Sequence, residues 1–293
     1  MSNDYGKVTR KPSWLKIKLH ENSEFAEVAA LVKENNLHTI CSSGKCPNQA
    51  ECWSRRTATF MILGDICTRS CKFCATATGK PLPVDPNEPR KVANSIKVMG
   101  LRHCVITSVD RDDLPDGGAK AWADTVKTIR EVNPDVTIEV LLPDFDNKHE
   151  LIDIVLESKP DIIGHNIETV RRLTPHVRSR AQYDRSLQVL EYVASKGFAA
   201  KSAIMVGLGE TDEEIHETLI DLRKANCSIV TLGQYLRPTM KHWPVERYVH
   251  PDTFEQYKQQ ALKIGFDFVE SAPLVRSSYM ADRAACCLKN KNK

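Results

Sequence analysis

The sequence has no apolar run that approaches the roughly 20 residues needed to span a bilayer. Its first 25 residues also lack the apolar segment of about 7–15 residues that marks a secretory signal. The net charge is only +3 over 293 residues, which gives no argument for a nucleic-acid surface. We therefore expect a cytoplasmic protein that binds neither membranes nor nucleic acid.

Cysteine, by contrast, is abundant. Six of the ten cysteines fall in two tight groups, and in a reducing compartment such spacing favours metal ligation over disulfides. The first group, CSSGKCPNQAEC, holds Cys41, Cys46 and Cys52, and the second, CTRSCKFC, holds Cys67, Cys71 and Cys74.

Apolar, β-branched runs alternate with helical stretches along most of the chain. Strands are predicted near 58–64, 102–108, 136–142, 160–168, 198–207 and 228–235, and helices near 88–99, 118–132, 147–158, 184–196, 212–225 and 252–264. Asp184 and Thr211 are candidate N-caps, and Gly100 and Gly197 candidate helix ends. This alternation predicts parallel strands with crossover helices, in an open sheet or a barrel. In both, functional sites gather at the carboxyl ends of the strands.

Three thiolates at C-x3-C-x2-C cannot close a four-coordinate zinc site alone. They can hold three irons of a [4Fe–4S] cluster and leave the fourth open to a substrate or cofactor. The alternative is a zinc knuckle with a remote fourth ligand. The first triplet also supplies only three thiolates for a cluster of four irons. A serine of the tail sequence RSSY could bind the fourth iron. Such a Fe–O bond would break readily on protonation, which suits a cluster that is meant to come apart.

The second triplet, on the loop after the first predicted strand, resembles that of the radical S-adenosylmethionine (SAM) superfamily. The resemblance implies an α/β fold, a partial (β/α)6 TIM-type barrel. The barrel would cover residues 54–270, between an N-terminal extension at 1–53 and a C-terminal tail at 271–293. It also implies that the open iron binds SAM and that cleavage of SAM gives a radical that abstracts hydrogen from an unactivated carbon.

Both triplets and the RSSY tail, together with TSVDRDDLPDGGA and IEVLLPDF, resemble the lipoyl synthase family specifically. This implies a sulfurtransferase that inserts sulfur at C6 and C8 of a protein-bound octanoyl-lysine. Two [4Fe–4S] clusters and two SAM molecules per lipoyl group would be used, and the first-triplet cluster would donate the sulfur. The implied partners are octanoylated carrier domains (2-oxoacid dehydrogenase E2 subunits and the glycine cleavage H protein), an electron donor such as ferredoxin or flavodoxin, and an Fe–S assembly carrier.

The resemblance also implies roles for single residues. Ser278 would be the serine ligand, with Ser277 as the less favoured choice. Glu139 and Asn166 would face the ribose and methionine parts of SAM, Arg178 would pair with its carboxylate, and Met205 would contact adenine. Asp110, Asp112 and Asp113 with Arg111 form a charge cluster that the sequence leaves unassigned.

Two other functions fit parts of the pattern. A radical SAM methylthiotransferase also uses two clusters, but it usually adds a nucleic-acid module for which this chain has no spare residues. A non-catalytic iron–sulfur or zinc protein explains the cysteines but not the polar loops at the predicted strand ends.

Overall fold

The computed structural model describes residues 10–16 and 22–291. The predicted absence of an export signal falls partly on residues 1–9 and 17–21, outside that range. No helix in the described part of the chain combines the length and apolar composition needed to cross a membrane.

One eight-stranded sheet organises the molecule. Its order is β1-β2-β5-β6-β7-β8-β9-β10, and within the described residues β1 alone runs antiparallel to its neighbour. The strands are β1 (His38–Thr39), β2 (Thr59–Ile62), β5 (His103–Ser108), β6 (Thr137–Leu141), β7 (Ile162–Gly164), β8 (Ala199–Val206), β9 (Ile229–Gln234) and β10 (Phe268–Ser271). A separate two-stranded ladder joins β3 (Ile66–Cys67) to β4 (Ala77–Thr78).

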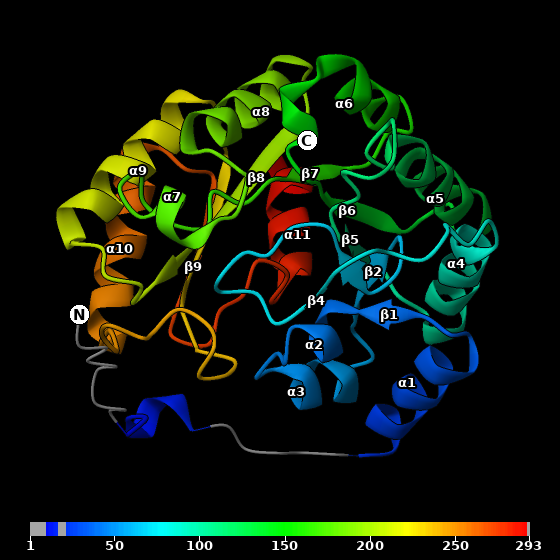
Figure 1. Cartoon of the computed structure of the whole chain (residues 1–293), viewed down its shortest axis with the longest axis horizontal. Coiled ribbons are helices and arrows are strands. Elements are labelled where there is room, and N and C mark those ends of the chain that lie inside the picture. The colour runs from blue at the N-terminus through cyan, green and yellow to red at the C-terminus, as the bar shows by residue number, and fades with distance from the viewer. Residues whose placement is uncertain (1–9, 17–21, 292–293) are drawn as a thin grey trace.

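Helices surround the curled sheet, as Figure 1 shows. The crossover helices are α4 (Glu88–Met99), α5 (Ala119–Val132), α6 (His149–Leu156), α8 (Tyr183–Ser195), α9 (Asp212–Lys224) and α10 (Pro251–Ile264). The shorter elements are η1 (Ser13–Leu15), α2 (Ile40–Ser43), α3 (Gln49–Ser54), η2 (Phe145–Asn147) and α7 (Thr174–Val177), and α1 (Ser23–Glu34) and α11 (Ala281–Lys291) lie near the two chain ends. The core between sheet and helices is apolar, with Trp122, Phe60 and Phe254 almost fully buried.

This architecture confirms the predicted α/β fold with a partial barrel, and all six predicted strands and six predicted helices are present. Thr211 caps α9 in a capping box with Glu214. Gly100 and Gly197 take left-handed conformations at φ 64° and 84°. The prediction of Asp184 as an N-cap was wrong because Gln182 holds that position. The strand β10 was not predicted.

The segment before β2 and the segment after β10 meet beside β2. Thr59 of β2 donates a hydrogen bond to the Ser278 hydroxyl over 2.8 Å, and Asn48 donates one to the Leu274 carbonyl over 2.7 Å. At the amino ends of β7 and β9, Ala284 and Ala285 of α11 pack against apolar strand residues. The division at residues 54 and 271 stays a prediction, and the sheet itself crosses both boundaries through β1 and Ser271.

Candidate active site

Two neighbouring cavities contain the two cysteine triplets. The barrel cavity, about 300 Å³, opens at the carboxyl ends of the strands, and its lining includes Cys67, Cys71, Cys74, Asp110, Asp144, Asn166, Glu168, Arg178 and Met205. The edge cavity, about 200 Å³, lies between the segment before β2 and the segment after β10, and its lining includes Cys41, Cys46, Cys52, Thr59, His103 and Ser278. Three residues line both cavities and so form the wall between them: Ile40, Arg276 and Ser277.

The loop that carries the second triplet is held at both ends. Cys67 is the last residue of β3, and its sulfur accepts backbone N–H groups from Arg69 at 3.4 Å and Asp110 at 3.3 Å. On the far side, His242 contacts the Cys74 carbonyl at 2.9 Å, and Trp243 donates its backbone N–H to the Lys72 carbonyl at 2.8 Å. The three sulfurs are therefore presented by a braced loop.

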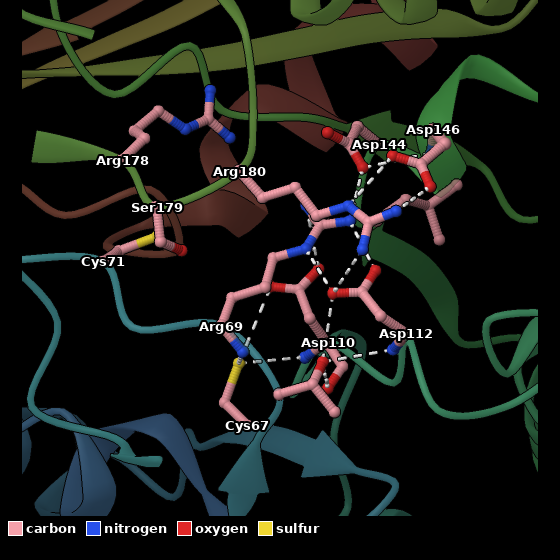
Figure 2. A network of polar contacts seen from close by, with 12 residues as sticks. Cys67, Arg69, Cys71, Asp110, Asp112, Asp144, Asp146, Arg178, Ser179 and Arg180 are labelled. Atoms are coloured by element: carbon pink, nitrogen blue, oxygen red, sulfur yellow. Dashed lines mark hydrogen bonds and ion pairs between the residues drawn. The ribbon is translucent and has the colours of Figure 1, made fainter. Parts of the chain in front are cut away.

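Arg69, between two cysteines of the triplet, is the centre of a buried ionic network (Figure 2). Its guanidinium donates to both carboxylate oxygens of Asp112, at 2.9 and 2.8 Å, and to Asp144 at 2.8 Å. Asp110 lies 3.4 Å away. Hydrogen bonds from Arg69 outweigh burial at Asp144 and lower the pKa of that carboxyl to about 2. One side chain thus ties the cysteine loop to the loops after β5 and β6.

This network gives most of the unassigned charge cluster a role. Asp110 and Asp112 face Arg69, whereas Arg111 forms its own pair with Asp113 at 2.9 Å and donates to the Leu63 carbonyl at 3.1 Å. The sequence reasoning missed Arg69. The one feature of the sequence that could have indicated Arg69 is its position between two candidate ligands, Cys67 and Cys71.

Three of the four residues predicted to contact SAM line the barrel cavity: Asn166, Arg178 and Met205. Asn166 donates to Glu168 at 3.1 Å, and Arg178 donates to the Ser186 hydroxyl at 2.9 Å. Glu168 was not predicted, although it lines the same cavity, where burial raises the pKa of its carboxyl. The predicted roles of these side chains stay predictions.

Glu139 lies away from the barrel cavity. Its side chain points into the barrel within β6, 3% exposed, and its Oε1 accepts a 2.6 Å bond from Lys201 of β8. Burial alone would raise the pKa of this carboxyl, but Lys201 and His103 together hold it below its ordinary value. A carboxylate paired in this way has little capacity left to bind the ribose of a SAM molecule in the barrel cavity.

In the edge cavity, α2 carries Cys41, the following turn carries Cys46 and α3 carries Cys52. Burial raises the pKa of all three thiols, and for Cys52 burial and the neighbouring thiols together raise it to about 12. The thiols are therefore protonated at neutral pH until a metal displaces the protons. Ser278 lies in this cavity alone, whereas Ser277 lines both cavities.

The donor sets of both cavities fit a cluster. All ten cysteines are free thiols. Within residues 10–16 and 22–291, no group of three or more His, Cys, Asp or Glu side chains is close enough to share a single metal ion. A [4Fe–4S] cluster takes each thiolate on a different iron and so accepts more widely separated sulfurs.

Gly233 of β9 supports the wall between the cavities. A Cβ at this position would lie 2.0 Å from the Val275 carbonyl oxygen and 3.3 Å from the Arg276 guanidinium. Gly233→Ala should therefore push the tail outward, lower the free energy of unfolding by about 1–3 kcal/mol and reduce iron retention in the edge cavity. Urea unfolding and iron analysis measure both effects. Gly79→Ala, whose Cβ would meet nothing closer than 3.5 Å, is the control, and equal behaviour of the two variants would contradict the prediction.

Comparisons with the sequences of known proteins agree on one protein family. The sequence profile of the Radical SAM superfamily matches residues 61–222. A lipoyl synthase from Parabacteroides distasonis is 59% identical over 94% of this chain and 98% of its own length. One from Treponema denticola is 56% identical over 94% of each chain.

Solved structures share the fold at much lower identity. A structure of SuiB from Streptococcus suis bound to SAM has a TM-score of 0.58 at 13% identity, over 78% of this chain and 55% of that one. Methylornithine synthase has a TM-score of 0.55 at 12% identity, over 88% and 85%.

Proposed function

Because this chain belongs to the radical SAM superfamily and, within it, to the lipoyl synthases, we propose that it inserts two sulfur atoms at C6 and C8 of an octanoyl group on a lysine of a lipoyl carrier protein. The observation that carries this proposal is the pair of thiol triplets in adjacent cavities with a shared wall. A reaction that must first remove hydrogen and then add sulfur at the same carbon needs two such sites side by side.

Lipoyl synthases use two [4Fe–4S] clusters and SAM. In this chain, Cys67, Cys71 and Cys74 would hold the cluster that reduces SAM. Cys41, Cys46, Cys52 and Ser278 would hold the cluster that supplies sulfur. An alkyl C–H bond is beyond the acid–base chemistry of side chains, so the bound groups supply the radical and the sulfur, and the protein supplies position and exclusion of water.

The barrel cavity offers matching groups for SAM. The guanidinium of Arg178 suits a carboxylate, which it can bind through two N–H groups. Asn166 and Glu168, joined by a 3.1 Å hydrogen bond, would take the ribose and amino groups, so Glu168 assumes the role expected of Glu139. Met205 would contact adenine from the end of β8.

The wall between the cavities would guide the octanoyl chain. Ile40 offers an apolar contact on both sides, and Arg276 sits beside it with a hydrogen bond to the Val275 carbonyl. The carbons to be modified would lie against this wall, between the source of the radical and the source of sulfur.

The identities of the carrier proteins, the electron donor and the Fe–S carrier are also part of the proposal. Carrier domains of 2-oxoacid dehydrogenase E2 subunits and the glycine cleavage H protein would present the octanoyl-lysine, ferredoxin or flavodoxin would supply electrons, and an Fe–S carrier would reload the edge cavity. Six clustered thiols that must stay reduced support a cytoplasmic location.

The test is anaerobic incubation with an octanoyl-lysine peptide, SAM and a reductant, followed by mass measurement. We expect a peptide that has gained two sulfur atoms, no change in the matched unacylated peptide, and about 8 irons per chain after reconstitution. An iron-free, zinc-loaded protein, or an octanoyl peptide that stays unchanged in the presence of both clusters, would contradict the proposal.

A further inference from the structure

A row of three charged or titratable side chains crosses the inside of the barrel. Lys201 of β8 donates to Glu139 of β6 at 2.6 Å, and Nε2 of His103 on β5 lies 3.7 Å from the other oxygen of Glu139. The side chains are 4%, 3% and 8% exposed respectively. Burial of two such charges is costly unless they have a partner, and Glu139 serves both of its neighbours.

His103 is the member of this row that reaches a cavity. It lines the edge cavity together with Val105, and Val105 pairs with Thr59, the residue that contacts Ser278. Neither ring nitrogen of His103 has a hydrogen-bond partner among the described residues. A buried imidazole normally finds such partners, so an unpaired one beside a cavity calls for an explanation.

The proposed reaction requires protons in the edge cavity, which this histidine lines. In the proposed reaction a carbon radical would form a bond to a sulfide supplied by the bound cluster, the cluster would take up one electron, and the resulting thiolate would need one proton. Two protons would therefore be needed for each lipoyl group, and the Ser278 side chain, if it holds the cluster as an alkoxide, would need a third on release. A titratable side chain that lines the cavity is positioned to supply them, and His103 is such a side chain.

We propose that His103 donates these protons into the edge cavity and that the Glu139–Lys201 pair keeps its imidazole oriented and able to carry positive charge. The proposal rests on the proposed function. The carboxylate of Glu139, held by Lys201 at 2.6 Å, lies 3.7 Å from Nε2 of that imidazole. His103 is reprotonated from solvent between the two sulfur transfers.

Other charges act on the same imidazole. Arg276 and Asp282 line the edge cavity with it, Asp282 from α11, which packs against β5. The charges of these two side chains have opposite signs, and both residues belong to the segment after β10. The cavity is also lined by the thiols of Cys41, Cys46 and Cys52, the guanidinium of Arg55 and the phenol of Tyr279.

The first experiment needs no turnover. Protein in a Cys71→Ala background, loaded with the edge cluster alone, is mixed with an iron chelator between pH 6 and pH 8. We expect iron release to accelerate as the pH falls, because proton transfer to the departing ligands is favoured at lower pH. His103→Gln should flatten this dependence and slow release at pH 6 by about tenfold, whereas His216→Gln, on the exposed face of α9, should keep the parent profile.

The second experiment separates proton donation from a structural role. In the otherwise native enzyme, His103→Gln should cleave SAM at the usual rate but form product at least about tenfold more slowly. Added imidazole should restore product formation to His103→Ala.

A parent-like pH profile in His103→Gln, or no imidazole rescue of His103→Ala, would overturn the proposal. So would the failure of both variants to hold iron in the edge cavity. If the unaltered enzyme adds no sulfur, the proposed function fails instead, whatever the His103 variants do.

Discussion

Cys41→Ala will cleave SAM yet form no sulfur-containing product, whereas Cys71→Ala will lose both activities. The reason is that the two residues lie in different cavities, Cys41 at the edge and Cys71 in the barrel, so each substitution removes one ligand set and leaves the other intact. Methionine and 5′-deoxyadenosine report cleavage of SAM, and peptide mass reports insertion of sulfur. Product formation should fall below detection in both variants.

Cys286→Ala is the matched control, since its thiol is exposed on α11 outside both cavities. It should retain both activities. Sulfur insertion by Cys41→Ala would show that the edge cavity is not the sulfur source. A further check loads the edge cluster with heavy sulfur, which should appear in the product at both carbons.

Arg69→Met should cost about 3 kcal/mol or more of unfolding free energy. The substitution removes the shared partner of Asp110, Asp112 and Asp144, and Asp144 is fully buried. The loop between Cys67 and Cys74 should loosen as well, because Arg69 ties it to Asp144 and supplies two of its hydrogen bonds to Asp112. Urea unfolding of the iron-free protein measures the first effect, and hydrogen exchange of the loop amides measures the second.

Two variants sharpen this test. Arg180→Met removes a half-exposed cation at the rim of the same network and should cost about 1 kcal/mol or less. Arg69→Lys keeps the positive charge but loses the planar guanidinium that bonds two carboxylates at once. Its loss of unfolding free energy should lie between those of Arg69→Met and Arg180→Met. If Arg69→Met were no less stable than Arg180→Met, the buried network would not hold the loop.

The same network predicts a pH dependence. The pKa of Asp144, about 2, is below its ordinary value of 3.8, so the stabilisation is complete above about pH 4 and is lost as the pH falls towards 2. The difference in stability between the parent and Arg69→Met should therefore narrow between pH 4 and pH 3. Burial raises the pKa of Asp110, whereas Arg69 lowers it, so the loss of Arg69 acts on this carboxyl in the same sense as on Asp112 and Asp144.

Sequence periodicity was sufficient to place the six strands and six helices because each carries a local signal, such as the capping box at Thr211. It missed β10, whose sequence FVES places two polar residues in four and so lacks the continuous apolar run that marks β2 and β7. It could not tell that Glu139 lies outside the lining of the barrel cavity, because strand alternation indicates which face a side chain takes but not which cavity that face lines. Arg69 and Asp144 are 75 residues apart, and no local pattern reports such a contact.

The edge cavity joins residues from near the two ends of the chain. Tyr279 donates a hydrogen bond to Glu51 over 3.1 Å although 228 residues separate them, and Ser278 lines the same cavity as Cys41, Cys46 and Cys52. The three thiols therefore leave the ribosome long before the serine does and lack its contacts in the interval. A polypeptide terminated before Ser278 would never gain these contacts, so synthesis of this segment acts as a checkpoint before the cluster is bound.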